Sequence, residues 1–279
     1  MKKFLLLLFF LLSISFNSSA FIRDSEIENT IKEIVAPIAE AAEQDKEKLK
    51  IFIINDKQLN AFVTPGQKIF IFSGLIVNSK NVNALEGVIA HELGHITGRH
   101  HIKIYDQIGK SRSVLLAGLI GGIAVQALTG DPNAAAAIAG GAMSTTRSSL
   151  LNFTRVQEGA ADQAGFSFLK KSGKSLCGVI SFLELLESMD PYYRQNAYSQ
   201  THPLTRERIE DARNAAKNEN CENNFKKKLT NITPSELSID EKYKFIQVKL
   251  IGFIDPENAV NTIKDSPKFN EDQKKYGYA

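Results

Sequence analysis

The stretch GVIAHELGHITGRHH, residues 87–101, sets two histidines four residues apart and puts a glutamate directly after the first. At this spacing His91 and His95 lie on one face of a helix, where two neutral imidazoles can bind one zinc ion. Glu92 then lies beside the metal without being a ligand, and it can take a proton from the attacking water. The HExxH pattern is short, however, and the same five residues also occur in ordinary polar helices.

The residues around this stretch predict that the helix is held in a core. Asn83 and Glu86 are spaced like a capping box at its start. Apolar residues recur every three or four positions after that start, which predicts one buried stripe. The stripe consists of Leu85, Val88, Ile89, Leu93 and Ile96. We expect the two histidines at its border.

A catalytic zinc ion usually has three protein ligands, so a third ligand must come from elsewhere in the chain. The best candidate is Glu158 in TRVQEGAADQAG, which follows His95 by 63 positions. Asp162 comes one helical turn later, where its carboxylate can accept the outer N–H of a ligand histidine. A Glu and an Asp one turn apart are by themselves more often a solvated helix face. Together with HExxH they predict a metallopeptidase that holds one Zn2+ per chain.

The first twenty residues have the pattern of a signal peptide. Lys2 and Lys3 precede an apolar run at residues 4–16, and small residues lead to a predicted cut after Ala20. The run is shorter than the roughly 20 residues that span a bilayer, so an uncleaved anchor is the weaker alternative. Without the two lysines the chain has 32 basic and 31 acidic residues, a balance that gives no indication of nucleic-acid binding.

Export would place the two cysteines, Cys177 and Cys221, in an oxidising compartment. The sequence does not say whether their Cα atoms lie close enough to be bridged. A disulfide and two free thiols therefore stay equally open.

The remaining pattern predicts a mainly helical α+β fold with a small sheet. Two β-rich runs, around residues 51–54 and 68–72, are joined through Pro65-Gly66. Helical patterns predict further helices at residues 21–50, 114–128, 133–143, 154–172, 176–189, 201–216, 240–254 and 255–266. We expect a domain at residues 21–216, then a polar linker from 217 and a C-terminal helix pair, turned at Asp255-Pro256 and ending by 279.

Residues 114–143 are rich in glycine and alanine and predict two short helices folded back on each other at Gly130-Asp131-Pro132. Gly118 and Gly122 form a GxxxG pattern, which permits close helix packing or contact with lipid. Each predicted helix is too short to span a membrane. Packing within the chain is the first interpretation, and peripheral membrane contact is the second.

Four segments, in this order, carry a resemblance to a known family: NAFVTPGQKIFIFSGLI, VIAHELGHITGRHH, TRVQEGAADQAG and THPLTRERI. From about residue 24 to residue 216 the chain resembles the zincin-type zinc metallopeptidases that include the CAAX prenyl protease and HtpX. It is most similar to their periplasmic branch, the β-barrel assembly-enhancing (BepA-like) proteases. In that branch tetratricopeptide repeats follow the catalytic domain, so the C-terminal helix pair here is expected to be a truncated repeat.

The resemblance implies a role for each matching residue. His91, His95 and Glu158 would be the zinc ligands, Glu92 the catalytic base, and Asp162 the carboxylate that supports a ligand. His202 and Arg208 would lie near the metal, stabilising the oxyanion or, for His202, binding zinc in a resting state. The alternative for His202 is a capping or surface histidine. The two remaining histidines match no ligand position, so the expectation is that both are solvated: His100 and His101.

The resemblance also implies an edge strand to which an extended substrate adds as a further strand. Its residues would be Asn60, Phe62, Ile69 and Ile71. This mode suits unfolded proteins, so the expected substrates are misfolded or stalled cell-envelope (outer-membrane) proteins in the periplasm. The chain departs from the family pattern in two places. Its repeat region is reduced, and it has Gly159-Ala160 where the family often has larger polar residues.

Two functions of different classes follow from these residues. The first is a zinc metalloendopeptidase, and the second is a non-catalytic, zinc-holding chaperone or assembly scaffold for unfolded envelope proteins. They differ at Glu92, because only the peptidase needs a base there.

Overall fold

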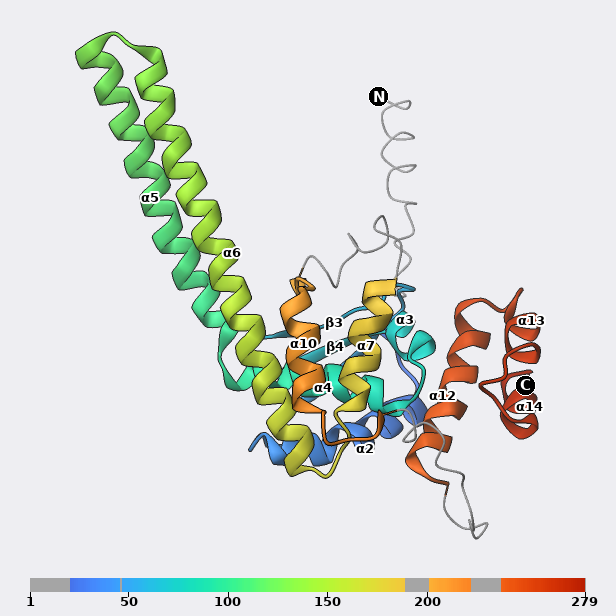
Figure 1. Ribbon diagram of the computed structural model, residues 1–279. Helices are drawn as coiled ribbons and strands as arrows, with labels where there is room; N and C mark the ends of the chain where they lie inside the picture. Colours follow the sequence, from blue (N-terminus) through green and yellow to red (C-terminus); the bar gives the residue numbers. More distant parts are fainter. Residues whose placement is uncertain (1–20, 46, 189–200, 222–236, 279) are drawn as a thin grey trace, which may run out of the picture.

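The computed structural model describes residues 21–45, 47–188, 201–221 and 237–278 (Figure 1). A small sheet and the helices packed on it form the body, from which a long helical hairpin, α5 and α6, projects. The strands are β1 (Phe21–Ile22), β2 (Lys50–Ile54), β3 (Ala61–Thr64) and β4 (Lys68–Phe72). The helices are α2 (Ser25–Ala41), α3 (Ser73–Asn78), α4 (Val82–Thr97), α5 (His100–Thr129), α6 (Pro132–Lys171), α7 (Cys177–Ser188), α10 (Arg206–Ala215), α12 (Ile239–Ile254), α13 (Ala259–Lys264) and α14 (Glu271–Tyr278). The predicted signal peptide and most of the predicted linker, residues 222–236, lie outside the described residues.

The sheet has the strand order β1-β2-β4-β3. The two predicted strands, β2 and β4, are parallel neighbours, and a short strand that the sequence did not reveal, β3, pairs antiparallel with β4. Pro65-Gly66 therefore turns β3 into β4 instead of joining the two predicted strands. Gly66 has φ 86°, a left-handed conformation that glycine adopts without strain.

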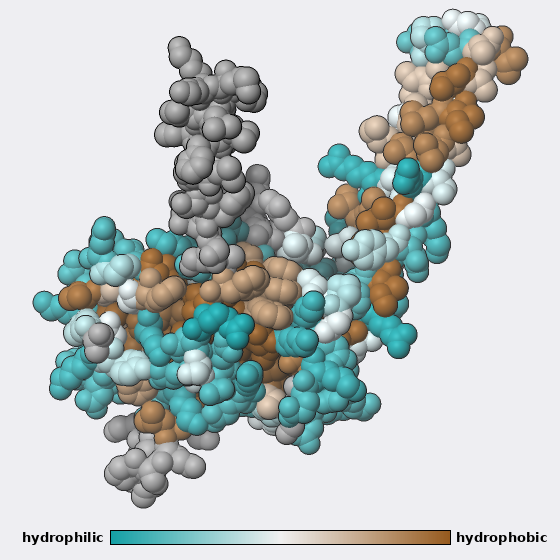
Figure 2. Space-filling view, turned by 180° about the vertical axis from the view of Figure 1, so that it is seen from behind, coloured by the Kyte–Doolittle hydropathy of each residue, from teal (hydrophilic) through white to brown (hydrophobic). Residues whose placement is uncertain are grey.

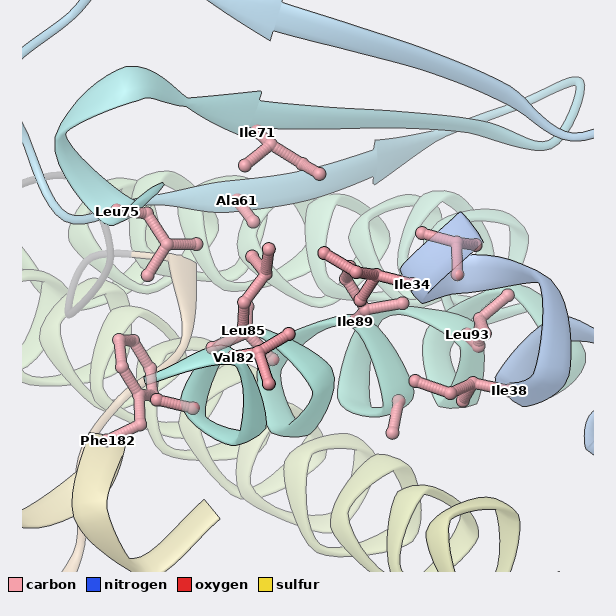
Figure 3. Close-up of a cluster of buried hydrophobic side chains, with 14 of the residues drawn as sticks. Ile34, Ile38, Ala61, Ile71, Leu75, Val82, Leu85, Ile89, Leu93 and Phe182 are labelled. Atoms are coloured by element: carbon pink, nitrogen blue, oxygen red, sulfur yellow. The ribbon is translucent and has the colours of Figure 1, made fainter. Parts of the chain in front are cut away.

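Helix α4 carries the HExxH stretch through the middle of the core. All five residues of the predicted stripe are buried, and Figure 3 shows Leu85 and Ile89 pointing from α4 toward the sheet, with Ile34 of α2 beside Ile89. The helix starts two residues earlier than the pattern suggested, so the prediction that Asn83 caps it is wrong. The cap is Asn81, whose Oδ1 accepts a hydrogen bond from the Ala84 N–H at 3.1 Å.

Helices α4 and α6 touch at backbone distance. A Cβ on Gly94 would lie 2.6 Å from the carbonyl oxygen of Ala161, closer than atoms can approach, so only glycine fits there. This contact places Glu158 and Asp162, on α6, directly against the histidines of α4. The fold thus joins the two sequence segments that carry the chemistry.

The hairpin is longer than predicted. Helix α5 begins at His100, and α6 runs without a break from Pro132, behind its Asp131 cap, to Lys171. The expectation that neither arm could span a membrane is wrong for α5, because its length and composition would suffice to cross one. Gly118 and Gly122 face α6, where added Cβ atoms would lie 2.1 Å from Ala142 and 2.8 Å from Ala135, so packing within the chain is confirmed.

The C-terminal residues form three helices, α12, α13 and α14, where a pair was predicted. Helix α12 belongs to the main core, because Tyr243 and Ile246 are fully buried there. The Tyr243 hydroxyl donates to the Ile76 carbonyl at 3.0 Å, and Gln247 Nε2 donates to the same oxygen at 2.7 Å. A tetratricopeptide origin of these helices stays a prediction.

Cys177 and Cys221 form a disulfide, with their Cα atoms 5.2 Å apart. The bond links the start of α7 to the segment that follows α10. Of the two alternatives left open by the sequence, pairing is the one observed.

Candidate metal centre

Four buried side chains from three parts of the chain converge on one point: His91 and His95 of α4, Glu158 of α6, and His202 just before α10. One ligand atom from each lies within 4.8 Å of all the others. His91 Nε2 lies 3.0 Å from His95 Nε2 and 3.2 Å from His202 Nδ1. The Glu158 carboxylate lies 3.3 Å from the Nε2 atoms of both α4 histidines and 3.2 Å from His202 Nδ1. The three expected ligands therefore meet, and His202 joins them.

These separations fit a single tetrahedral metal ion. Bonds of about 2.0–2.1 Å from a central ion to nitrogen or oxygen place neighbouring ligand atoms roughly 3.3 Å apart. Three imidazole nitrogens and a carboxylate that converge in this way are a donor set for such an ion.

In the metal-free cluster the electrostatics put His95 and Glu158 in the form that binds a metal, whereas His91 must lose a proton to do so. Burial lowers the pKa of His95 to about 3, so this ring is neutral. Burial also disfavours a charged His91, but the nearby charge of Asp162 outweighs it and raises the pKa of His91 to about 10. Burial disfavours the ionised Glu158 as well, yet hydrogen bonds from His202, His91 and His95 hold its pKa far below the usual range. The carboxylate is thus ionised, as a metal ligand must be.

Asp162 supports the cluster from outside. Its Oδ1 lies 2.8 Å from His91 Nδ1, the ring nitrogen turned away from the other ligands. Such a contact fixes the tautomer and the orientation of a ligand histidine.

Arg208 completes that support. It binds the Asp162 carboxylate with two donors, Nε at 2.6 Å and Nη2 at 2.9 Å. Its Nη1 lies 3.0 Å from Glu158 Oε2 and donates to the Pro203 carbonyl at 3.1 Å. These contacts engage the guanidinium of Arg208 with the protein, and its predicted role in stabilising the oxyanion stays a prediction.

Glu92 is fully buried beside the cluster. Its Oε1 lies 3.4 Å from His202 Nε2, and within the described residues neither of its oxygens has a hydrogen bond. Burial raises the pKa of this carboxyl above its ordinary value. An unsatisfied buried carboxylate is costly, and a raised pKa at such a position is typical of a general base.

His100 differs from its expectation. It was expected to be solvated, but it is only 7% exposed, and its Nδ1 lies 2.9 Å from His95 Nδ1. Arg99 adopts a left-handed conformation (φ 51°) between α4 and α5, and this turn directs His100 back toward the ligand. His101, its neighbour, is partly exposed, and its ring makes no hydrogen bond through Nδ1 within the described residues.

A cavity of about 390 Å³ opens beside the cluster. Its walls include Glu92, His95, Glu158 and His202 together with Phe62 and Val63 of β3. Phe62 lies on β3, an outer strand of the sheet, and the binding of a substrate along it stays a prediction. The predicted edge position fails elsewhere. It is wrong for Ile69 and Ile71, which lie on β4 inside the sheet with fully buried side chains. Asn60 immediately precedes β3 and is buried.

The sequence was compared with those of known proteins. The profile of peptidase family M48 matches residues 25–216. The chain belongs to peptidase family M48. Its HExxH and downstream glutamate coincide with the buried cluster, so the ligand pattern of an M48 metallopeptidase is present in sequence and in space.

Several characterised members are similar to the chain. It is 30% identical over 200 residues to the β-barrel assembly-enhancing protease of Escherichia coli, a match that covers 71% of the chain and 41% of that protein. The metalloprotease YcaL of E. coli is 31% identical over 170 residues, 59% of the chain and 60% of the relative. The mitochondrial metalloendopeptidase OMA1 of Schizosaccharomyces pombe is 26% identical over 163 residues, 58% of the chain and 45% of the relative. The chain thus spans about two fifths of the length of the β-barrel assembly-enhancing proteases that it matches.

Proposed function

We propose that the protein is a zinc metalloendopeptidase that hydrolyses peptide bonds in misfolded or stalled cell-envelope proteins. The observation that carries this proposal is the fully buried carboxylate of Glu92, which accepts no hydrogen bond from a described residue and lies beside a four-donor cluster. Three imidazole nitrogens and a carboxylate are the donors that zinc prefers. Zinc, when bound, would supply Lewis-acid activation of water and of the substrate carbonyl.

The protein residues have separate tasks in this reaction. His91, His95 and Glu158 would hold the metal, while Asp162 and Arg208 keep His91 and Glu158 in place. Glu92 would take a proton from the attacking water and then give it to the leaving amine. Burial raises the pKa of this carboxyl, which favours its acting as a proton acceptor.

His202 has the geometry of a fourth ligand. Its Nδ1 faces Glu158 and His91, and its Nε2 faces Glu92. Catalytic zinc sites keep one position open, whereas structural sites are closed by four protein ligands. We propose that the arrangement seen here is a resting state, in which His202 must leave before the site can hydrolyse a peptide.

The cavity and β3 support an extended substrate. In an antiparallel pair, hydrogen-bonded and non-hydrogen-bonded residues alternate. The Phe72 N–H donates to the Asn60 carbonyl, so these two residues form a hydrogen-bonded pair. Ala61 and Val63 are then in non-hydrogen-bonded pairs and direct their backbone groups away from β4. A substrate strand added there would run along the cavity past Glu92. Binding through backbone groups suits unfolded proteins in general.

Three observations support the proposed location of the protein. The relatives named for β-barrel assembly, the signal-peptide pattern and the disulfide all support export to the periplasm. Envelope proteins that fail to fold are the substrates that this place offers.

A second function is favoured by one observation. Four protein donors that close on one point resemble a structural zinc site, which would suit a zinc-holding chaperone or scaffold that binds unfolded chains along β3. Such a protein would not need Glu92 to be a carboxylate.

One experiment separates the two functions. The zinc-loaded chain is incubated with a denatured β-barrel protein, and Glu92→Gln, Glu92→Asp and His202→Ala variants are tested beside it, with zinc content measured in each. The peptidase is established if the wild type or His202→Ala yields fragments and the same chain carrying the Glu92→Gln substitution yields none. If zinc is bound in every variant and none of them yields fragments, the peptidase proposal fails and the scaffold stands.

A further inference from the structure

The outer part of the α5–α6 hairpin is almost free of charge. Between residues 113 and 146 the only Asp, Glu, Lys or Arg is Asp131, in the turn that joins the two helices. Only 6% of the most apolar window of α5 is buried. Figure 2 shows the apolar surface along the outer hairpin, with a polar tip. A helix that is apolar on all sides is suited to a protein core or to lipid, and the described residues provide no core here.

Individual apolar side chains on this surface are largely exposed to solvent. Ile120 is 66% exposed, Ile123 70% and Leu128 86% on α5, and Met143 is 62% exposed on α6. The two arms satisfy their own backbone hydrogen bonds and pack closely at Gly118 and Gly122. Such a hairpin can enter hydrocarbon without leaving a backbone polar group unpaired.

A ring of positive charge lies where the apolar part begins. Thr146 Oγ1 donates to the Ser111 carbonyl at 3.4 Å, so these two positions lie at the same height of the hairpin. Lys110, Arg112 and Arg147 flank this level, and we call these three residues the basic collar. None of the three forms an ion pair with another described residue. Basic residues at the edge of an apolar helix are complementary to anionic lipid headgroups.

We propose that the hairpin inserts into a membrane that contains anionic lipids, with the basic collar at the headgroups. The 17 residues of α5 above the collar, 113–129, reach about 25 Å at roughly 1.5 Å per residue. This approaches the hydrocarbon thickness of about 30 Å. Asp131 would then lie near the opposite headgroups instead of the bilayer centre, where a carboxylate is costly.

This insertion would set the height of the metal centre above the lipid. Glu158 follows Arg147 by eleven residues on the continuous helix α6, which corresponds to about 16 Å along its axis. Phe153 and Gln157, between them, line the cavity beside the cluster. The proposed peptidase would therefore work on chains close to the membrane surface.

The insertion can be observed without any assay of activity. The chain has no tryptophan, so Ile123→Trp places a single tryptophan, which can be excited selectively over the tyrosines, in the apolar part of the hairpin. The matched control is Phe253→Trp on α12, which replaces a residue that is 57% exposed. Each variant of the full chain is mixed with phosphatidylethanolamine–phosphatidylglycerol vesicles whose acyl chains carry bromine, a quencher within the hydrocarbon. We expect quenching and a blue shift for Ile123→Trp and neither for Phe253→Trp. Equal emission with and without vesicles for Ile123→Trp would overturn the proposal.

The collar is tested by flotation with the same vesicles. Reversing its charges in Lys110→Glu/Arg112→Glu/Arg147→Glu should weaken binding by at least about a hundredfold, because each lost basic residue near an anionic surface costs about a factor of five and each new carboxylate is repelled. The control reverses three exposed lysines elsewhere, Lys32, Lys217 and Lys264, with the same change in net charge. If the control loses as much binding as the collar variant, the collar has no specific role and that part of the proposal is wrong.

A second copy of the chain is the other occupant that this surface could take. Sedimentation without lipid distinguishes it. A wild-type dimer that Ile123→Glu converts to a monomer, together with no quenching in vesicles, would assign the surface to self-association and exclude the membrane.

Discussion

The Nδ1 atoms of His95 and His100 lie 2.9 Å apart across the turn between α4 and α5. A hydrogen bond between two ring nitrogens requires one donor and one acceptor. Since His95 faces the cluster through Nε2, its Nδ1 must carry the proton and donate it to His100. Burial lowers the pKa of His100 to about 4, so its ring is neutral and able to accept. His100 therefore holds His95 as Asp162 holds His91.

We predict that His100→Phe weakens zinc binding by about tenfold to a hundredfold, the effect usual for losing a hydrogen bond to a metal ligand. The measurement is competition with a chromophoric chelator. His101→Phe is the matched control, because the His101 ring makes no hydrogen bond through Nδ1 to a described residue. Equal zinc affinity in the two variants would remove His100 from the metal centre.

His202→Ala should raise the rate at which the zinc-loaded protein cleaves an unfolded substrate. His202 Nδ1 lies 3.2 Å from Glu158 and occupies the fourth ligand position, where water and substrate must enter. A resting state favoured by about 1.4 kcal/mol would hold back activity about tenfold, and that is the increase we expect. The rate is measured at saturating zinc. An unchanged or abolished activity would mean that His202 does not keep the enzyme latent.

Particular residues show which features of the structure can be predicted from the sequence. The core stripe of α4 and the positions of His91, His95, Glu158 and Asp162 depend on helical periodicity, which is a local property, and they lie where it predicts. The family resemblance added His202 and Arg208, which no local pattern marks.

The failures are places where a contact distant in sequence decides the structure. His100 turns inward because Arg99 takes a left-handed conformation, and no residue preference indicates that turn. Strand β3 is four residues long, and it is a strand because β4 pairs with it. The prediction that Ile69 and Ile71 lie at the edge is wrong because the sequence does not reveal β3, the strand outside them. Whether Cys177 and Cys221 pair depends on how α7 and α10 pack, which spacing does not encode.

Arg208→Met should destabilise the metal-free protein by about 3–5 kcal/mol, because it takes away the guanidinium that pairs with the buried carboxylates of both Asp162 and Glu158. Arg208→Lys should recover only part of this, since an amine cannot bind Asp162 with two fixed donors. Urea unfolding in the presence of a chelator measures the free energy of unfolding.

The matched control for Arg208 is Arg213→Met on the same helix. Arg213 pairs with Glu184 at 2.8 Å, but its side chain is 53% exposed, so the loss of stability should be much smaller than that of Arg208→Met. Similar losses in the two variants would contradict the positioning role of Arg208.

Removing the disulfide with Cys177→Ser/Cys221→Ser should lower the free energy of unfolding by about 2–4 kcal/mol, because the bond closes a long loop in the unfolded chain. The two cysteines are 44 residues apart, and the loop contains both His202 and Arg208. Urea unfolding checks the value, and reduction of the wild type should reproduce it. A double variant as stable as the oxidised wild type would show that the bond does not restrain this segment.

The outward edge of β3 gives the most direct test of substrate binding. Val63 directs its N–H away from β4, as the register and the Phe72–Asn60 hydrogen bond require. Val63→Pro removes that donor and leaves the pairing with β4 intact, since proline is tolerated on the free side of an edge strand. A lost backbone hydrogen bond is worth about 0.5–1.5 kcal/mol, so kcat/KM for an unfolded protein should fall about two- to tenfold, mainly through KM. Val63→Thr is the control, because it changes the side chain in the cavity but keeps the N–H. If Val63→Pro and Val63→Thr cleave equally well, the substrate does not pair with β3, and the cavity must bind it through side chains alone.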